Sequence, residues 1–152
     1  MYRFALRLLF AASVMVLIAG VGIQLVPYGR PTANPPVRVE PRWNAPETRE
    51  LAVRACFDCH SNQTHYPWYS YVAPVSWLVQ KDVVEGRAKL NFSEWDLPQR
   101  EAHESAEEVQ KGEMPPAIYL PTHPEARLSD AEKQALVRGL RATIDSDRPR
   151  RR

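Results

Sequence analysis

The run C-F-D-C-H at positions 56–60 limits what the chain can fold into more than any other feature, because it puts Cys56, Cys59 and His60 within about one turn. Two thiols at this spacing can bond to the two vinyl groups of a single porphyrin, and the histidine behind them can bind its iron through a neutral imidazole nitrogen. Both cysteines of the chain are in this run. The motif predicts one covalent c-type haem, with His60 as the proximal iron ligand.

Three other sites would use part of the same run. A thioredoxin-like redox pair needs a β–α–β context, whereas the residues before Cys56 favour a helix. A zinc site completed by His60 and His65 would lack the usual second pair of ligands at finger-like spacing. A disulfide between cysteines three residues apart would close too small a loop to restrict the unfolded chain much. The sequence favours haem over these alternatives.

The N-terminal segment predicts a membrane anchor. After Arg3 and Arg7, the residues from Leu8 to Val26 carry no charge, and this stretch is long enough to span a bilayer. A cleaved signal peptide would have a shorter apolar stretch ending at a small-residue cleavage site, and no such site precedes Pro27. Residues 1–26 are therefore expected to form an uncleaved, single-pass transmembrane helix.

Basic residues alone do not orient this predicted helix. Arg3 and Arg7 precede it, and Arg30, Arg38 and Arg42 follow it, so the positive-inside rule favours neither side. Covalent attachment of c-type haem takes place outside the cytoplasm. The haem motif therefore predicts a bacterial cytoplasmic-membrane protein whose haem domain is in the periplasm.

Proline and charge divide the rest of the chain. Residues 27–43 are rich in proline, which fixes φ and removes amide donors, so an extended tether is expected there. A haem-binding domain over 44–147 follows, and residues 148–152 form a basic tail, for which a disordered end is the ordinary interpretation. Contact of this tail with anionic lipid headgroups or an acidic partner is the alternative.

Capping residues and apolar periodicity predict four helices in the domain. Asn44 and Ser129 are suited to the N-cap position, and Ser129 opens a capping box with Glu132. Gly86 and Gly112 are suited to ending helices. No stretch alternates as a strand does, so the predicted fold class is all-α. The predicted helices cover residues 45–55, 75–85, 98–111 and 129–144.

Aromatic residues gather soon after the haem motif. Trp68, Tyr69 and Trp77, with Tyr66 and Tyr71, are candidates for the wall of a pocket around a flat apolar ligand, with their polar tips free to reach propionates or water. Ordinary core packing of a small domain would explain the same residues. Trp68, Tyr69 and Trp77 are the predicted pocket residues.

Met114 is the candidate for the second axial iron ligand. It is the single methionine beyond the N-terminal segment, and it stands before two prolines in an irregular stretch. A thioether is a soft ligand for iron, and His/Met ligation raises the reduction potential. A gap-filling core methionine is the alternative. His103 and His123 would be the substitute ligands.

Seven short runs resemble the bacterial haem-binding domain family of short, membrane-anchored c-type haem proteins. The resemblance implies a small cytochrome-c-like helical domain with one haem attached through Cys56 and Cys59, His60 as its ligand, and Met114 at the position of the distal ligand. In the last helix this chain has R-G-L at 138–140, where the family would have a bulky aromatic residue. The runs are R-A-C-F-D-C-H-S-N at 54–62, P-W-Y at 67–69, A-P-V-S-W at 73–77, D-V at 82–83, G-R at 86–87, N-F-S at 91–93 and G-E-M-P-P at 112–116.

The distribution of charge along the chain indicates what kind of partner the domain could bind. Residues 44–147 hold 11 Lys and Arg against 17 Asp and Glu, although the whole chain has a net charge of +2. An acidic surface suits a basic redox partner, and a solvated helix face is the ordinary alternative. Nucleic acid is not an expected partner, because the predicted compartment lies outside the cytoplasm.

Two function classes follow. The first is a haem protein that passes single electrons between membrane and periplasmic partners, and is not an enzyme. The second is a haem-based sensor or peroxidase-like enzyme, which needs a displaceable sixth ligand and a distal acid or base such as His65 or His103. No residue pair in the sequence requires the second class.

Overall fold

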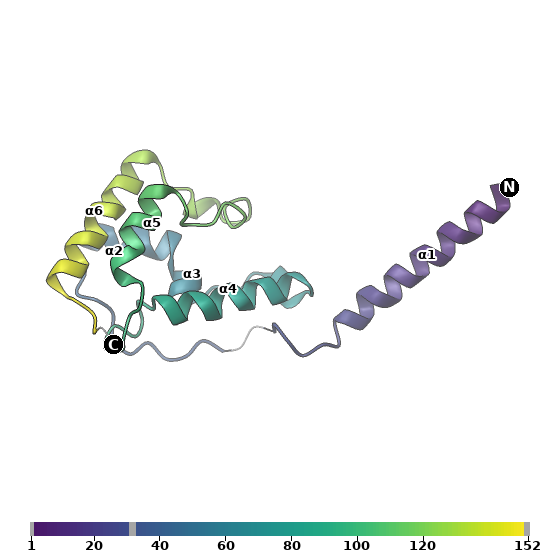
Figure 1. Ribbon diagram of the computed structural model, residues 1–152, viewed down its shortest axis with the longest axis horizontal. Coiled ribbons are helices and arrows are strands. Elements are labelled where there is room, and N and C mark those ends of the chain that lie inside the picture. Colours follow the sequence, from purple (N-terminus) through teal and green to yellow (C-terminus); the bar gives the residue numbers. More distant parts are fainter. Residues whose placement is uncertain (1, 31–32, 151–152) are drawn as a thin grey trace. The chain divides into compact units, whose positions relative to one another are not determined.

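The computed structural model describes residues 2–30 and 33–150. Met1 of the predicted anchor, residues 31–32 of the predicted tether and residues 151–152 of the basic tail lie outside them. Within the described residues no strand is assigned, and the one β-type pairing is an isolated bridge between Val39 and Glu94. The predicted all-α fold with an N-terminal apolar helix is therefore confirmed. The helices are α1 (Tyr2–Ile23), α2 (Pro46–Ala55), α3 (Phe57–His60), α4 (Val75–Lys89), α5 (Ser105–Lys111) and α6 (Asp130–Ser146), with 3₁₀ turns at Trp68–Tyr71, Ala102–Glu104 and Pro124–Ala126 (Figure 1).

The chain forms two compact units, which are described separately. The anchor unit consists of Met1–Thr32 and Pro67–Lys81, and the motif unit consists of Ala33–Tyr66 and Asp82–Arg152. The haem motif and Met114 are in the motif unit.

Helix α1 of the anchor unit is long and apolar enough to cross a membrane, and none of its residues is buried. A signal sequence would meet the same criteria of length and composition.

The core of the motif unit lies directly against the haem motif. Helices α2 and α5 both pack on α6 (Figure 1). Phe57, inside the motif, stacks on Phe92 with ring centroids 5.8 Å apart, and Phe92 stacks on Trp95 at 6.0 Å. The motif is thereby part of the core. The other large buried core side chains are Leu51, Leu90, Val109, Leu136, Val137 and Leu140.

Two predicted helix ends are confirmed. Ser129 and Glu132 form the reciprocal capping box at the start of α6, which satisfies backbone donors of its first turn. Gly112 ends α5 in the left-handed conformation, with φ of 80°. Gly139, inside the R-G-L run that departs from the family pattern, lies where any Cβ would collide with the side chain of Thr48, so α2 and α6 approach closely there.

Three other predicted helix limits are wrong. The N-cap of α2 is Ala45, while Asn44 exchanges hydrogen bonds with Thr143: its amide donates to Oγ1 (3.1 Å) and its Oδ1 accepts from Oγ1 (3.2 Å). A tertiary partner thus replaces the local cap. Helix α4 continues past Gly86, and the helix predicted for 98–111 is shorter, since a 3₁₀ turn precedes α5.

The second half of the predicted tether is part of the motif unit and is hydrogen-bonded to residues that follow α4. The amides of Arg38 and Val39 donate to the carbonyl of Ser93 (2.9 and 3.2 Å), and the amide of Trp95 donates to the carbonyl of Val39 (3.0 Å). Trp43 then packs against the core. The residues between the prolines keep their amide donors, and those donors find partners far along the chain.

Candidate functional site

Backbone hydrogen bonds set the geometry of the motif turn. The amide of Cys56 donates to the carbonyl of Ala52 (2.8 Å), which joins the turn to the end of α2. The amides of Cys59 (3.2 Å) and His60 (2.9 Å) both donate to the carbonyl of Cys56. Both thiols and the imidazole are thus carried by one hydrogen-bonded turn.

The imidazole of His60 is held by α4. Its Nδ1 lies 3.0 Å from the carbonyl oxygen of Gly86 and 3.1 Å from that of Leu90. Both partners are acceptors, so Nδ1 carries the proton and Nε2 keeps its lone pair. Desolvation lowers the pKa of His60, which favours the neutral ring. A backbone carbonyl on the second nitrogen is the usual support of a metal-binding histidine.

A glycine makes this contact possible. A Cβ on Gly86 would lie 2.6 Å from the carbonyl oxygen of Cys59, a distance that real Cβ atoms essentially never show. Helix α4 therefore reaches the motif only because position 86 has no side chain. The sequence marked Gly86 as a helix end and as part of a family run, and its close approach to the motif was missed.

The loop behind the motif is fixed by buried polar side chains. The amide of Asn62 donates to Oγ of Ser93 (2.9 Å), and Nδ2 of Asn91 donates to Oδ1 of Asn62 (2.9 Å). Arg87 adds a bond from Nε to the carbonyl of Ser61 (2.7 Å). The sequence offered one signal for this network, because these residues fall within runs that resemble the haem-binding domain family.

Both thiols are free and have the properties of buried, unactivated cysteines. Desolvation raises the pKa of Cys56 and of Cys59 to about 12, and Asp82 and Asp58 add to the shift at Cys59. A thioredoxin-like pair has an activated thiol of lowered pKa, which is the opposite shift. Over residues 2–30 and 33–150, moreover, no group of three or more His, Cys, Asp and Glu side chains is arranged to hold a metal ion. The thiol-redox and zinc alternatives thus gain no support.

Met114 lies in an irregular segment just after α5. Its amide donates to the carbonyl of Glu108 (3.2 Å), and its side chain, like that of Cys56, packs against the core of the motif unit. His103, by contrast, is exposed, with Nε2 3.4 Å from Oε1 of Glu104. His123 is buried. The role of Met114 as distal ligand stays a prediction.

An unexpected cluster ties the segment after Met114 to the motif. Oη of Tyr119 donates to Oδ2 of Asp58 (2.6 Å), and its ring stacks on that of His123 with centroids 3.6 Å apart. Desolvation is the main cause that raises the pKa of Tyr119, and the hydrogen bond to Asp58 is the second. Asp58 and Tyr119 are 61 positions apart, and no local pattern indicated that they would meet.

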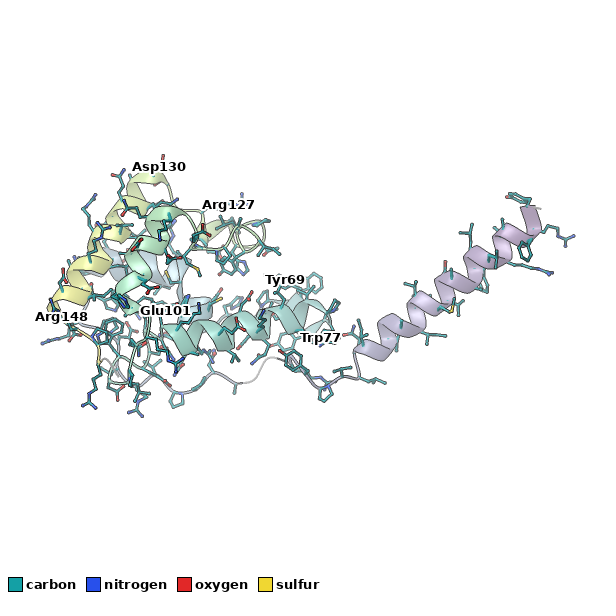
Figure 2. The ribbon with its side chains drawn as sticks, in the orientation of Figure 1. Tyr69, Trp77, Glu101, Arg127, Asp130 and Arg148 are labelled. Carbon is teal, nitrogen blue, oxygen red and sulfur yellow. The ribbon has the colours of Figure 1, made fainter. Side chains whose placement is uncertain are left out.

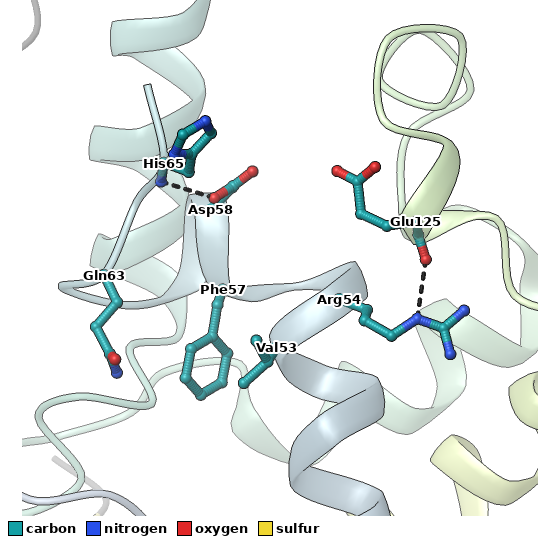
Figure 3. A pocket seen from close by; sticks show the side chains of 7 residues that line it. All are labelled: Val53, Arg54, Phe57, Asp58, Gln63, His65 and Glu125. Atoms are coloured by element: carbon teal, nitrogen blue, oxygen red, sulfur yellow. Dashed lines mark hydrogen bonds between the residues drawn. The ribbon is translucent and has the colours of Figure 1, made fainter. Parts of the chain in front are cut away.

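A small cavity of about 330 Å³ adjoins the motif turn (Figure 3). On one side the amide of His65 donates to Oδ1 of Asp58 (2.9 Å), and on the other Nε of Arg54 donates to the carbonyl of Glu125 (3.0 Å). None of the predicted haem ligands lines it. The lining residues are Val53, Arg54, Phe57, Asp58, Gln63, His65 and Glu125.

The predicted pocket aromatics are in the anchor unit and differ in exposure. Trp68 is 77% exposed, whereas Tyr69, in the same 3₁₀ turn, and Trp77, in the first half of α4, are half-buried (Figure 2). Trp77 Nε1 is buried and has no hydrogen-bond partner, and the same holds for Oγ of Ser70 and Oε1 of Gln80. Their roles as haem-pocket residues stay predictions.

The chain matches the haem-binding domain family over residues 18–142. It belongs to this family. The comparisons with curated proteins and with solved structures gave no match. The resemblance carried by the seven short runs is thus confirmed, and this member of the haem-binding domain family is a haem-binding protein.

The donors of this haem-binding domain fit the group. Two free thiols and one imidazole with an available Nε2 are on the same turn, and a thioether packs against the same core. No residue of the motif turn conflicts with haem.

Proposed function

We propose that this haem-binding domain carries one covalently attached c-type haem and transfers single electrons at the outer face of a bacterial cytoplasmic membrane, without being an enzyme. The observation that carries the proposal is the motif turn, where Cys56, Cys59 and a pre-oriented His60 come together. When bound, haem supplies an iron that changes its charge by one electron.

Each residue of the turn has a separate task in this proposal. Cys56 and Cys59 would supply the thiols for two thioether bonds, which hold the cofactor even when the chain unfolds. His60 would bind iron through Nε2, while the carbonyls of Gly86 and Leu90 fix the tautomer and the plane of its ring. Met114 would fill the sixth position and raise the potential.

The remaining features suit a membrane-bound electron carrier. Helix α1 would anchor the chain, and the acidic surface of residues 44–147 would attract a basic redox partner protein. Carboxylates of α5, at the exposed Glu107 and the half-buried Glu108, are candidates for that contact. We expect no nucleic-acid partner in the proposed compartment.

Covalent attachment is tested by denaturing gel electrophoresis. The full chain is exported in cells that possess the c-type haem attachment machinery, and the gel is stained for haem. We expect haem to migrate with the polypeptide and to be lost in the Cys56→Ala, Cys59→Ala variant. Export of the unmodified chain without retained haem would contradict covalent attachment while leaving haem binding by the family intact.

The choice between carrier and enzyme is tested on the loaded protein. A firmly bound Met114 blocks the sixth position, so carbon monoxide and peroxide should leave the haem absorption spectrum unchanged. A rapid spectral change with either reagent would instead favour a sensor or a peroxidase-like activity.

A further inference from the structure

Two uncharged stretches that are far apart in the sequence meet in the anchor unit. No charged side chain occurs in residues 8–29 or in residues 67–80. Gln24, one residue beyond the end of α1, joins them: its Nε2 donates to the carbonyl of Ala73 (3.0 Å), and its Oε1 accepts from the amide of Ala73 (3.0 Å). The 67–80 stretch is therefore attached to the C-terminal end of the apolar helix.

A second contact strengthens this attachment. The rings of Tyr28 and Trp77 have centroids 6.5 Å apart. Gly29 lies so close to Trp77 that a Cβ there would be 2.5 Å from Cδ1 of the indole. The chain leaving α1 thus packs on the first half of α4, at the end labelled by Tyr69 and Trp77 in Figure 2.

The two units differ in their content of acidic residues. All 18 Asp and Glu residues of the chain belong to the motif unit, and the anchor unit contains none. The charged side chains of the anchor unit are all basic: Arg3, Arg7, Arg30 and Lys81. Bacterial membrane surfaces carry anionic lipids, which attract basic groups and repel carboxylates. The anchor unit is the one that suits a membrane surface.

The 67–80 stretch also presents an exposed apolar edge. Trp68 is 77% exposed and Tyr71 61%, and three aliphatic side chains beside them are more than 40% exposed. Trp and Tyr favour the interface between hydrocarbon and water, where the ring is buried and the polar tip stays hydrated. The lipid-contact edge, as it is called below, consists of Trp68, Tyr71, Val72, Val75 and Leu78.

The length of α1 fixes the depth of this edge. A helix of 22 residues is about 33 Å long, close to the ~30 Å of a hydrocarbon core. If α1 spans the bilayer, Gln24 lies at the boundary between hydrocarbon and headgroups. The stretch that is hydrogen-bonded to Gln24 must then lie at the same boundary.

We propose that the lipid-contact edge rests in the interfacial layer of the bilayer that α1 spans. The inference depends on the proposed membrane anchoring of α1. It assigns Trp68 to lipid and leaves the half-buried Tyr69 and Trp77 as the candidates for the haem pocket. The 67–80 stretch then serves as a second, reversible membrane contact in addition to the anchor helix.

Photolabelling of the full, haem-loaded chain in nanodiscs tests the proposal. The nanodiscs contain phosphatidylethanolamine, phosphatidylglycerol and a phosphatidylcholine with a diazirine near the glycerol end of one acyl chain. After irradiation and digestion, mass spectrometry locates the labelled peptides. We expect label within residues 8–29 and within residues 67–79, and none in α6.

A double variant and a matched control sharpen the result. Trp68→Ser with Tyr71→Ser should lose the label in residues 67–79 and keep it in 8–29. Leu97→Ser, which removes an exposed apolar side chain from the motif unit, should change neither label. Unchanged labelling of 67–79 in the double variant would overturn the proposal, and a changed haem spectrum would then assign Trp68 to the haem pocket.

Labelling of the unmodified chain tests the lipid-contact edge and the membrane anchor separately. Label in residues 8–29 without label in 67–79 overturns the lipid-contact edge and leaves the membrane anchor standing. Label in neither segment overturns both. Haem retention on a denaturing gel is measured on the same samples, so a failure of haem attachment is recognised independently of either result.

Discussion

The two predicted iron ligands are held in different ways. His60 is fixed from three directions, because the carbonyls of Gly86 in α4 and of Leu90 just after it accept from its ring and the amide of Phe92 donates to its own carbonyl (2.8 Å). Met114 lies outside any helix. It is held by one hydrogen bond from its backbone amide to the carbonyl of Glu108 and by contact of its side chain with the core. The orientation of the proximal ligand is thus fixed by hydrogen bonds to the backbone, whereas the position of the distal ligand depends mainly on side-chain packing.

This difference suits a site in which attachment and tuning are separate tasks. A preset imidazole and two thiols on one turn keep their geometry whatever occupies the distal side. A ligand on an irregular segment can take its final position when the cofactor is present. Changes on the proximal side should therefore abolish loading, and changes on the distal side should alter the loaded state.

The largest effect is expected from Gly86→Ala. The new Cβ would collide with the carbonyl of Cys59, so α4 must move away and the two bonds to His60 must lengthen. Forcing such a contact typically costs about 1–3 kcal/mol, which exceeds the ~1 kcal/mol that alanine gains over glycine in a helix. We expect a lower melting temperature and a large loss of covalent haem per polypeptide.

Gly22→Ala is the matched control for Gly86→Ala, because a Cβ at Gly22 meets nothing within 4 Å. Both changes replace a helical glycine by alanine, and only one should affect haem loading. Normal loading and stability in Gly86→Ala would show that the close approach of α4 does not matter.

Met114→Leu should leave haem attached and change the loaded state. Leucine keeps most of the volume of the side chain and removes the sulfur, so packing is preserved and ligation is lost. We expect changed absorption spectra in both oxidation states and a lower reduction potential, measured by redox titration. Met15→Leu in α1 serves as control. Spectra identical to those of the unmodified protein would exclude Met114 as a ligand.

Tyr119→Phe should weaken the distal side alone. The variant loses the hydrogen bond to Asp58, and for a half-exposed pair the expected cost is about 1 kcal/mol. We expect faster proteolysis between Gly112 and Arg127, measured by limited digestion. We expect the amount of covalent haem, measured by staining a denaturing gel, to be normal. Tyr71→Phe, at an exposed tyrosine, is the control. Reduced haem loading in Tyr119→Phe would mean that this bond also supports attachment.

The smallest effect concerns acid stability on the proximal side. The bonds from Arg49 are the main cause that lowers the pKa of Glu40 below its ordinary 4.5, with smaller help from Trp43. A carboxylate with a lowered folded pKa contributes stability above the unfolded pKa, and that contribution is lost as the pH falls below about 4.5. Because Arg49 is partly exposed, roughly 0.5 kcal/mol is expected.

Glu40→Gln should therefore flatten the pH dependence of unfolding below pH 4.5 and lower stability slightly at pH 7. Chemical unfolding followed by circular dichroism at a series of pH values measures this. Glu50→Gln, which removes an exposed carboxylate from α2, the helix that carries Arg49, is the control. Equal acid sensitivity in both variants would contradict a role for the pair.

The sequence alone determined those features whose cause lies within a few residues. The motif at 56–60, the apolar stretch that forms α1, the capping box at Ser129 and the end of α5 at Gly112 each depend on neighbours at most a few positions away. The all-α fold follows from the same local signals, and the seven short runs were enough to identify the family. Features that depend only on neighbouring residues can therefore be predicted from the sequence.

Only the tertiary structure decided the features that join distant segments. Asn44 pairs with Thr143, 99 positions away, and therefore does not cap α2. Gly86 lies inside α4, where the carbonyl of Cys59 occupies the space that a side chain would need, and Tyr119 reaches Asp58 across 61 positions. Such partners compete with local preferences through contacts that exist only once the chain has folded, so no window of the sequence contains them.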